Sequence, residues 1–276
     1  MSRAGESLHA APNRPDPPDA RVADRHAGAR VGPVKPFVLL ATRAEDAAAD
    51  GEYEALLRYG GLTPDQLLRV RLEAAPMPDL DLDAFSGVIV GGSPFTTSEP
   101  EDTKSDVQKR VEAELGDLVR EVVARDVPFF GACYGVGTVG VITGGVVDST
   151  YGEPVGAVRI ALTDAGRADP VFGAMPAEFD AFVGHKEAVR VPPPGAVVLA
   201  TSPACPVQAF RVGRNVYATQ FHPELDVPGI ETRIEVYRHS GYFAPEEIDA
   251  LLAEVRRADV SHAPDVLRGF VERYAR

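Results

Sequence analysis

The sequence predicts an α/β protein in which an open, three-layer, mostly parallel sheet is covered by helices on both faces. Residues 37–41, 87–90 and 127–130 are short continuous apolar runs, as expected for strands that are buried on both faces. Between the second and third runs, residues 105–125 place apolar side chains at helical spacing. Alternation of buried strands with amphipathic helices is typical of a parallel sheet.

The other predicted elements extend this pattern toward the C-terminus. Residues 52–59 and 63–68 are predicted as two helical pieces separated by a glycine pair. Residues 151–216 turn toward β-rich patterns, and residues 216–221 form a last apolar strand. The chain after residue 229 becomes helical again, with apolar residues spaced as a packing face.

The sequence divides into three parts of different character. Residues 1–36 are rich in proline, arginine, aspartate and alanine and show no hydrophobic period, which predicts a disordered N-terminal arm. Residues 37–240 contain every predicted strand and form the predicted domain. Residues 241–276 are predicted as a helical extension that packs on this domain.

Composition narrows the classes of partner and compartment. The formal net charge of −13 argues against nucleic acid or an anionic membrane surface as a partner, because both require clustered Lys and Arg. No run of about eighteen apolar residues exists that would span a membrane. The two cysteines, Cys133 and Cys205, do not form a disulfide framework in a chain of 276 residues, so we expect a reducing, cytoplasmic setting.

Cys133 follows an apolar run and lies within the sequence FFGACYGVG, residues 129–137. The Gly-x-Cys-x-Gly pattern is typical of a strand that ends in a tight turn into a helix, because small neighbours let the backbone bend sharply. Backbone N–H groups at the start of that helix would point at the sulfur and favour the thiolate over the thiol. A structural cysteine in the core is the alternative interpretation of this residue alone.

His222 and Glu224 lie in the sequence QFHPE, directly after the predicted strand 216–221. Residues two apart on an extended chain point to the same side, and Pro223 keeps the preceding residue extended. One ring nitrogen of His222 can therefore bond to the carboxylate while the other faces the thiol. With Cys133, this pair supplies the nucleophile, base and orienting carboxylate of a thiol acyl-transfer site.

Six blocks of sequence occur in order along about residues 37–240, and they read FSGVIVGGSP, GACYG, GGV, EPVG, GHKE and QFHPE. Together they resemble the class I glutamine amidotransferases, and within them the amidotransferase part of GMP synthase. The resemblance implies a flavodoxin-like fold with a nucleophile elbow, and a catalytic triad of Cys133, His222 and Glu224. It implies no metal and no organic cofactor.

Four further residues are candidates for binding substrate or its charged intermediate. The backbone N–H groups of Gly92 and Tyr134 are predicted to form the oxyanion hole, because both follow strands that end at one edge of the sheet. His185, in the block GHKE, matches a histidine shared by the family. Relatives usually carry glutamine at the position of Gly137, where it helps to hold the substrate. Its absence predicts either weaker glutamine binding or room for a larger γ-glutamyl group.

Three functions are compatible with these residues. The first is a glutaminase that hydrolyses the glutamine side-chain amide through a thioester on Cys133 and releases ammonia to a separate synthetase. The sequence shows no phosphate-binding loop that the synthetase activity itself would need. The second function is a stand-alone γ-glutamyl peptidase or hydrolase that uses the same triad on a small molecule or peptide. The third is a non-catalytic subunit, which the intact triad argues against.

Overall fold

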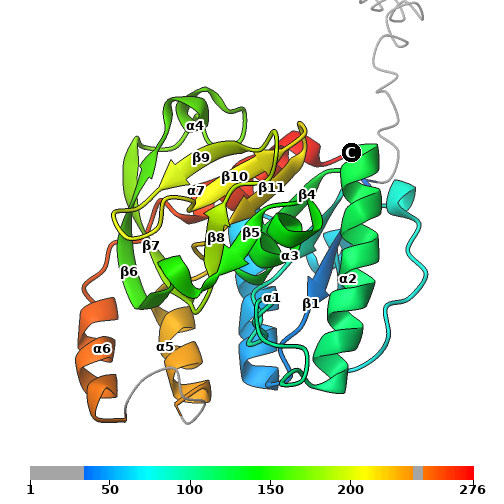
Figure 1. Cartoon of the computed structure of the whole chain (residues 1–276). Coiled ribbons are helices and arrows are strands. Elements are labelled where there is room, and N and C mark those ends of the chain that lie inside the picture. The colour runs from blue at the N-terminus through cyan, green and yellow to red at the C-terminus, as the bar shows by residue number, and fades with distance from the viewer. Residues whose placement is uncertain (1–33, 239–244) are drawn as a thin grey trace, which may run out of the picture. The chain divides into compact units, whose positions relative to one another are not determined.

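The structure, a computed structural model, describes residues 34–238 and 245–276. Nine strands of these residues form one sheet in the order β2-β1-β3-β4-β11-β10-β9-β6-β7 (Figure 1). The nine strands are β1 (Phe37–Ala41), β2 (Leu67–Arg71), β3 (Gly87–Val90), β4 (Phe129–Ala132), β6 (Glu153–Leu162), β7 (Glu178–His185), β9 (Val197–Thr201), β10 (Ala209–Val212) and β11 (Val216–Thr219). Strands β5 (Val146–Asp148) and β8 (Ala188–Val191) pair separately as a two-stranded ribbon.

The sheet has a parallel part and an antiparallel part. Strands β2, β1, β3, β4 and β11 run parallel to one another, with Phe37 opposite Leu67 and Gly87. Strands β10, β9, β6 and β7 continue the sheet with antiparallel pairing. The parallel core confirms the predicted fold class, and the antiparallel extension accounts for the β-rich pattern of residues 151–216.

Helices cover both faces of the parallel strands (Figure 1). Helices α1 (Asp46–Gly60) and α7 (Pro264–Tyr274) pack on the face to which Phe37 and Leu39 point. Helices α2 (Asp106–Arg125) and α3 (Tyr134–Ile142) pack on the face of Val38 and Leu40. Successive residues of one strand therefore enter opposite apolar layers, which is why β1 reads as a continuous apolar run.

The helix predicted over residues 63–68 is wrong. Pro64–Gln66 forms a single 3₁₀ turn, closed by a capping box between the side chains and backbone of Thr63 and Gln66. Strand β2 then begins at Leu67, because its backbone pairs with β1 along five residues. Tertiary pairing overrides the weak local preference for helix. Helix α1, in contrast, begins at Asp46, six residues before the predicted start at residue 52.

Three shorter helices complete the described part of the chain: α4 (Asp164–Ala168), α5 (Val227–Val236) and α6 (Ile248–Val255). Ile230, Ile234 and Ile248 form with Phe182 of β7 a third apolar cluster, which joins α5 and α6 to the antiparallel part of the sheet. The predicted arm 1–36 lies outside the described residues except for its last three positions. None of the described helices is both long enough and apolar enough to cross a bilayer.

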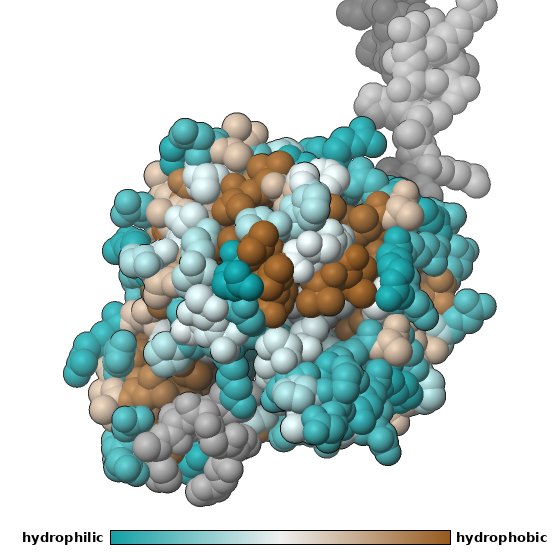
Figure 2. Space-filling view, viewed as in Figure 1, coloured by the Kyte–Doolittle hydropathy of each residue, from teal (hydrophilic) through white to brown (hydrophobic). Residues whose placement is uncertain are grey.

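The surface in front of α3 carries a group of exposed valines. Val141 lies on α3, whereas Val146 and Val191 are paired on β5 and β8, and each of the three is more than a third exposed. Figure 2 shows apolar side chains gathered in the middle of this face, over the region where these elements lie in Figure 1.

Candidate active site

Cys133 occupies the sharp turn between β4 and α3. Its backbone has φ 50° and ψ −87°, a conformation that non-glycine residues rarely adopt. The bend brings Gly131 and Gly135 together, and a Cβ on Gly131 would lie 2.9 Å from the Cα of Gly135. Gly131 is therefore required by close approach of the backbone, whereas a Cβ on Gly135 would meet no atom nearer than 3.7 Å. The turn presents the thiol at the C-terminal edge of the sheet.

Three adjacent strands end at this edge and place the predicted residues there. Strand β4 leads to Cys133, β3 leads to Gly92 and β11 leads to His222. The N–H of Cys133 donates to the carbonyl of Thr219 at 2.7 Å, which ties the elbow to the end of β11. The N–H of His222 donates to the carbonyl of Phe182 on β7 at 2.9 Å. Backbone bonds thus hold both segments in register.

The predicted bond between His222 and Glu224 is present. Nδ1 of His222 lies 2.7 Å from Oε1 of Glu224, and both side chains are buried. Nη2 of Arg233 donates to the same carboxylate oxygen at 2.9 Å. Nη1 of Arg233 also lies 3.0 Å from Nδ1 of His222. In the tautomer whose Nδ1 proton is donated to Glu224, Nε2 of His222 has its lone pair free to accept a proton.

The charge state of the thiol differs from the prediction. Burial raises the pKa of Cys133 to about 12, and the nearby cations Arg43 and Arg233 oppose this rise without cancelling it. Burial and these charges together thus favour the thiol over the thiolate. Burial and then the charge of Arg233 lower the pKa of His222 to about 4, against the opposing effect of Glu224. The free site at neutral pH is a thiol beside a neutral imidazole.

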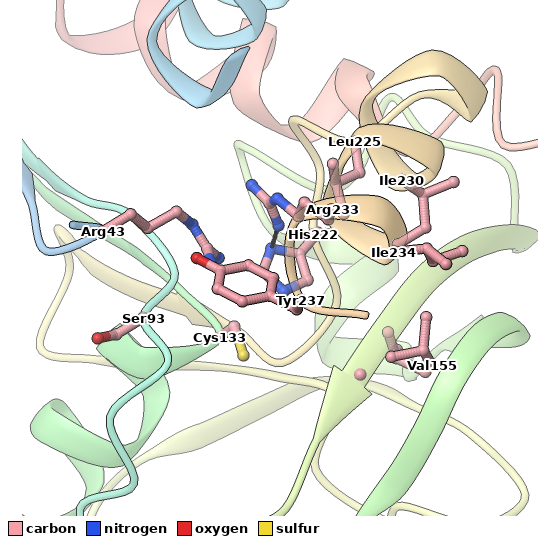
Figure 3. Close-up of a pocket in the computed structure, with 12 residues that line it drawn as sticks. Arg43, Ser93, Cys133, Val155, His222, Leu225, Ile230, Arg233, Ile234 and Tyr237 are labelled. Carbon is pink, nitrogen blue, oxygen red and sulfur yellow. Dashed lines mark hydrogen bonds between the residues drawn. The ribbon is translucent and has the colours of Figure 1, made fainter. Parts of the chain in front are cut away.

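The contact between nucleophile and base is open in this structure. Within residues 34–238 and 245–276, the only side chain that bonds to Sγ of Cys133 is Gln220, whose Nε2 lies 3.9 Å away. Cys133 and His222 nevertheless line one cavity (Figure 3). Catalytic hydrogen bonds are often loose before substrate binds, so the sulfur has to approach Nε2 of His222 when the site is filled.

A buried cluster of charges lies behind the imidazole and was not predicted. Oε1 of Glu52 accepts from Nε of Arg43 at 3.2 Å and from Nη2 of Arg233 at 3.3 Å. Arg43 also donates to the hydroxyl of Tyr237 at 3.1 Å. Burial raises the pKa of Glu52, and the two guanidinium groups act against that rise. Two carboxylates, those of Glu52 and Glu224, thus face two guanidinium groups.

The two predicted oxyanion donors, the N–H groups of Tyr134 and Gly92, differ in their surroundings. Tyr134 is the first residue of α3, so its N–H has no acceptor within the helix and stands next to the nucleophile. The N–H of Gly92, predicted as the second donor, instead donates to Oε1 of Glu52 at 3.1 Å. In this conformation the peptide of Gly92 therefore serves the buried carboxylate. Gly92 still lies beside His222, since a Cβ there would be 2.7 Å from Cε1 of the imidazole.

Two cavities meet at Cys133 and differ in character. One holds polar and charged groups and is lined by Ser93, Phe95, Thr96, Cys133, Tyr134, Gly184, His185, Lys186, Glu187 and Gln220. The other contains the imidazole and an aliphatic wall, and is lined by Arg43, Ser93, Cys133, Val155, Val183, Gly184, His222, Leu225, Ile230, Arg233, Ile234 and Tyr237 (Figure 3). We refer to them below as the polar cavity and the aliphatic cavity.

His185 lies at the polar cavity, but both of its ring nitrogens are bonded inside the protein. Nδ1 lies 2.9 Å from the carbonyl of Glu187, and Nε2 lies 2.9 Å from Oε2 of Glu153. Gln208 and Ser202 bond to the same buried carboxylate. His185 therefore shapes the cavity wall through this network.

Gly137 does not open additional room. A Cβ at this position would lie 2.8 Å from Oγ1 of Thr97 and 3.0 Å from Oε1 of Glu187. That carboxylate accepts the N–H groups of Thr97 and Ser98 at 2.8 and 2.7 Å, so it anchors the loop that follows β3. This loop fills the space beside Gly137, so the structure leaves no extra room for substrate at this position, contrary to that part of the prediction.

We expect Gly137→Ala to destabilise the protein by about 1–2 kcal/mol, because overpacking outweighs the gain of about 1 kcal/mol in helix propensity. The matched control is Gly51→Ala, in the exposed middle of α1, where an added Cβ meets nothing within 4 Å. That variant should gain about 0.5–1 kcal/mol. Chemical denaturation of both variants measures the two changes in unfolding free energy, and a stabilised Gly137→Ala variant would contradict the packing described.

The pH dependence of activity should follow the lowered pKa of His222. Only the neutral imidazole accepts the thiol proton, so activity is lost as pH falls through about 4 and is constant through neutrality. The thiol of Cys133 stays protonated over the same range. A profile of kcat/KM against pH checks this. Loss of activity centred near pH 6.5 would mean that the pKa of His222 is not lowered, and would contradict the expectation. The same shift makes folding less stable as pH falls from about 6.5 toward 4, because only the unfolded chain takes up the proton there.

Comparison with known proteins agrees with this geometry. Residues 65–232 match the family model described as glutamine amidotransferase class-I. One subunit of a glutamine-hydrolysing GMP synthase from Saccharolobus solfataricus is 30% identical over 193 residues, which cover 67% of this chain and 94% of that protein. A GMP synthase from a Parafrankia species is 35% identical over 117 residues, covering 42% of this chain and 21% of that protein. The chain belongs to the class I glutamine amidotransferase family.

Solved structures show the same fold. A glutamine amidotransferase from Thermotoga maritima superposes with a TM-score of 0.70 at 20% identity, covering 87% of this chain and 98% of that one. Another, from Methylobacillus flagellatus, gives a TM-score of 0.67 at 21% identity and covers 87% of this chain and 94% of that one. The predicted resemblance is thus confirmed at the level of family and fold.

Proposed function

We propose that this protein hydrolyses the side-chain amide of glutamine through a glutamyl thioester on Cys133, with His222 and Glu224 completing the triad. One observation carries the proposal. The strained elbow and the bonded His222–Glu224 pair reach the same cavity from the C-terminal ends of two adjacent strands. A buried structural cysteine needs neither backbone strain nor an oriented imidazole beside it.

The acylation step follows from the charge states of the free site. Nε2 of His222 takes the proton of the thiol as Sγ of Cys133 attacks the amide carbon. Glu224 stabilises the imidazolium that forms, and its carboxylate is suited to this because His222 and Arg233 outweigh burial and hold its pKa well below the ordinary value. The imidazolium then returns the proton to the leaving nitrogen as the carbon–nitrogen bond breaks.

Deacylation uses the same groups in reverse order. Nε2 of His222 takes a proton from water, the hydroxide adds to the thioester carbonyl, and Sγ of Cys133 leaves and regains a proton. Glutamate is released and the site returns to its starting state. Both tetrahedral intermediates carry a negative oxygen, which the N–H of Tyr134 is placed to stabilise.

The second oxyanion donor requires a local rearrangement. For the N–H of Gly92 to reach the oxyanion, its bond to Glu52 has to break. Two guanidinium groups, from Arg43 and Arg233, remain to hold the carboxylate when it does. Loss of one oxyanion donor costs about 2.7–4 kcal/mol in other enzymes, so this rearrangement decides how active the free chain is.

The polar cavity suits the glutamyl half of the substrate. Lys186 and Glu187 both line it, and the buried carboxylate of Glu187, which already accepts the N–H groups of Thr97 and Ser98, gives that wall a negative charge suited to the α-ammonium group of free glutamine. His185, fixed by its two internal bonds, supports this wall. We therefore place the amino-acid end of the substrate there and the scissile amide at Cys133.

A separate synthetase is the proposed recipient of ammonia, in a cytoplasmic setting. Support comes from the relative in Saccharolobus solfataricus, which is named as one subunit of a GMP synthase and is of similar length to the matched part of this chain. GMP synthases such as the one from Parafrankia are several times longer than their matched segment. The synthetase activity would accordingly come from another polypeptide.

Release of ammonia and glutamate by the purified chain tests the proposed reaction. Free glutamine and a γ-glutamyl dipeptide are compared side by side, with asparagine as a control of one methylene less. Turnover of glutamine supports the glutaminase. Turnover of the dipeptide but not of glutamine would instead support a γ-glutamyl hydrolase. The observation that favours this second function is the aliphatic cavity next to His222.

A further inference from the structure

The side of Cys133 that holds the imidazole is lined largely by aliphatic side chains. Val155 of β6 and Val183 of β7 face Ile230 and Ile234 of α5 across the aliphatic cavity, and Leu225 extends the same wall. Figure 3 shows Leu225, Ile230, Ile234 and Val155 grouped on one side of the imidazole, with Arg43 and Ser93 on the other. Ammonia, a small polar molecule, gains nothing from such a wall.

The position of His222 determines which half of a substrate enters this cavity. The group that protonates the leaving nitrogen has to be within hydrogen-bond reach of it, and His222 lines the aliphatic cavity but not the polar one. The leaving amine therefore departs on the side of Ile230 and Ile234. The glutamyl half is left with the polar cavity, in agreement with the charge of Glu187 in its wall.

We propose that the substrates of this site include γ-glutamyl amides whose leaving amine carries a short, neutral aliphatic chain, which packs against Val155, Ile230 and Ile234. This substrate class rests on the proposed thioester chemistry of Cys133. In the reaction of such an amide, the γ-carbonyl carbon forms a bond to Sγ of Cys133, and the bond from that carbon to the amide nitrogen breaks. The imidazolium of His222 supplies the proton, the alkylamine leaves, and water then releases glutamate from the thioester.

The size of the aliphatic cavity limits the chain length. Its volume is about 60 Å³. Because a water molecule needs roughly 10–15 Å³ of such a space, the cavity admits a substituent of roughly four heavy atoms. Ethyl to butyl chains fit this volume, whereas an aromatic or long-chain amine exceeds it unless the wall moves.

The charged residues of the cavity favour a neutral substituent. Arg43 and Arg233 line its polar end and are already paired with Glu52 and Glu224, so a substituent with a positive charge would lose its hydration beside the aliphatic wall without gaining a free carboxylate. Glu52 and Tyr237 already bond to Arg43, at 3.2 and 3.1 Å, so an anionic substituent would have to compete with existing partners. A neutral alkyl group makes neither demand.

The test compares the full-length chain on a series of γ-glutamyl amides. The substrates are glutamine and its N-methyl, N-ethyl, N-propyl and N-butyl derivatives, with the N-(2-hydroxyethyl) and N-(2-aminoethyl) amides as polar and cationic analogues close in size to N-propyl. We expect kcat/KM to rise by about fourfold per methylene up to the length that fills the cavity. The hydroxyethyl and aminoethyl amides should fall below the N-propyl amide by at least tenfold.

Substitution of the wall tests where the alkyl group lies. Ile234→Ala enlarges the aliphatic cavity and should move the preferred chain length upward by one or two carbons. Ile248→Ala removes an equal side chain from the same apolar cluster but does not line the cavity, so it is expected to lower thermal stability and leave the preferred length unchanged. Equal preference profiles for these two variants would overturn the assignment.

Covalent labelling separates failure of this inference from failure of the proposed function. A chloroketone analogue of glutamine, whose chloride the thiol displaces, reports by mass spectrometry whether Cys133 and the glutamyl site are competent. Labelling together with equal or faster turnover of glutamine than of every alkylamide would refute the inference alone. Labelling without turnover of any alkylamide would also refute it. No labelling and no turnover would remove both the proposed function and the substrate class.

Discussion

Replacing Cys133 by alanine is expected to lower the hydrolysis of any γ-glutamyl amide by at least about 10⁴-fold. In the proposed mechanism the acyl intermediate forms on this thiol, and loss of the nucleophile in comparable triads costs as much as loss of the whole triad. The fold should survive, because alanine removes one atom and the backbone of the elbow is held by Gly131 and Gly135. Rates of glutamate release from the purified variant measure the effect.

Cys205 provides the matched control for this experiment. It is buried, whereas Cys133 is partly exposed, and its thiol donates to the carbonyl of Val207 at 3.5 Å. It lines neither cavity at Cys133. Cys205→Ala should keep kcat within about twofold while losing roughly 1 kcal/mol of stability. A Cys133→Ala variant that keeps more than about a tenth of the wild-type rate would contradict the assignment of Cys133 as the nucleophile.

Replacing Glu224 by glutamine is expected to lower kcat by about 10³–10⁴-fold. The amide keeps the size of the side chain but loses the charge that stabilises the imidazolium, and its NH₂ group can favour the wrong tautomer of His222. The substitution also leaves Arg233 with one carboxylate partner fewer, so a loss of stability accompanies the loss of rate. Both the melting temperature and single-turnover rates below it are to be measured.

The second buried His–Glu pair gives a control with the same chemistry. Glu153 holds Nε2 of His185 at 2.9 Å, and both side chains are as buried as the His222–Glu224 pair. Glu153→Gln should destabilise the fold and raise KM, because it loosens the wall of the polar cavity. It should not lower kcat by more than about tenfold, since His185 transfers no proton. Equal losses of kcat in the two variants would show that Glu224 acts only through stability.

The features that sequence predicts well are those encoded by neighbours along the chain. The elbow at Cys133 depends on glycines two residues away on either side. The pair of His222 and Glu224 depends on the two-residue period of an extended strand. The five residues of β1 read as a buried strand because both faces of that strand meet apolar layers.

Features set by distant residues were missed. Arg43 lies just after β1, at the edge of the sheet where active sites form, and Glu52 lies on the following helix α1; their charges were the available signal. Arg233 reaches the same carboxylates from α5, and nothing local predicts that its side chain is buried. The rise in the pKa of Cys133 was not predicted, because burial of the thiol depends on the whole fold and outweighs the nearby cations Arg43 and Arg233.

The central claim is a glutamyl thioester on Cys133, and partition of that intermediate by hydroxylamine tests it most directly. Hydroxylamine added to the reacting protein should divert the glutamyl group to γ-glutamyl hydroxamate while ammonia or amine release continues at an unchanged rate. Wild-type protein and Cys205→Ala should both form hydroxamate, and Cys133→Ala should form none. Amine release with no hydroxamate at any hydroxylamine concentration, or hydroxamate formation by Cys133→Ala, would contradict the account.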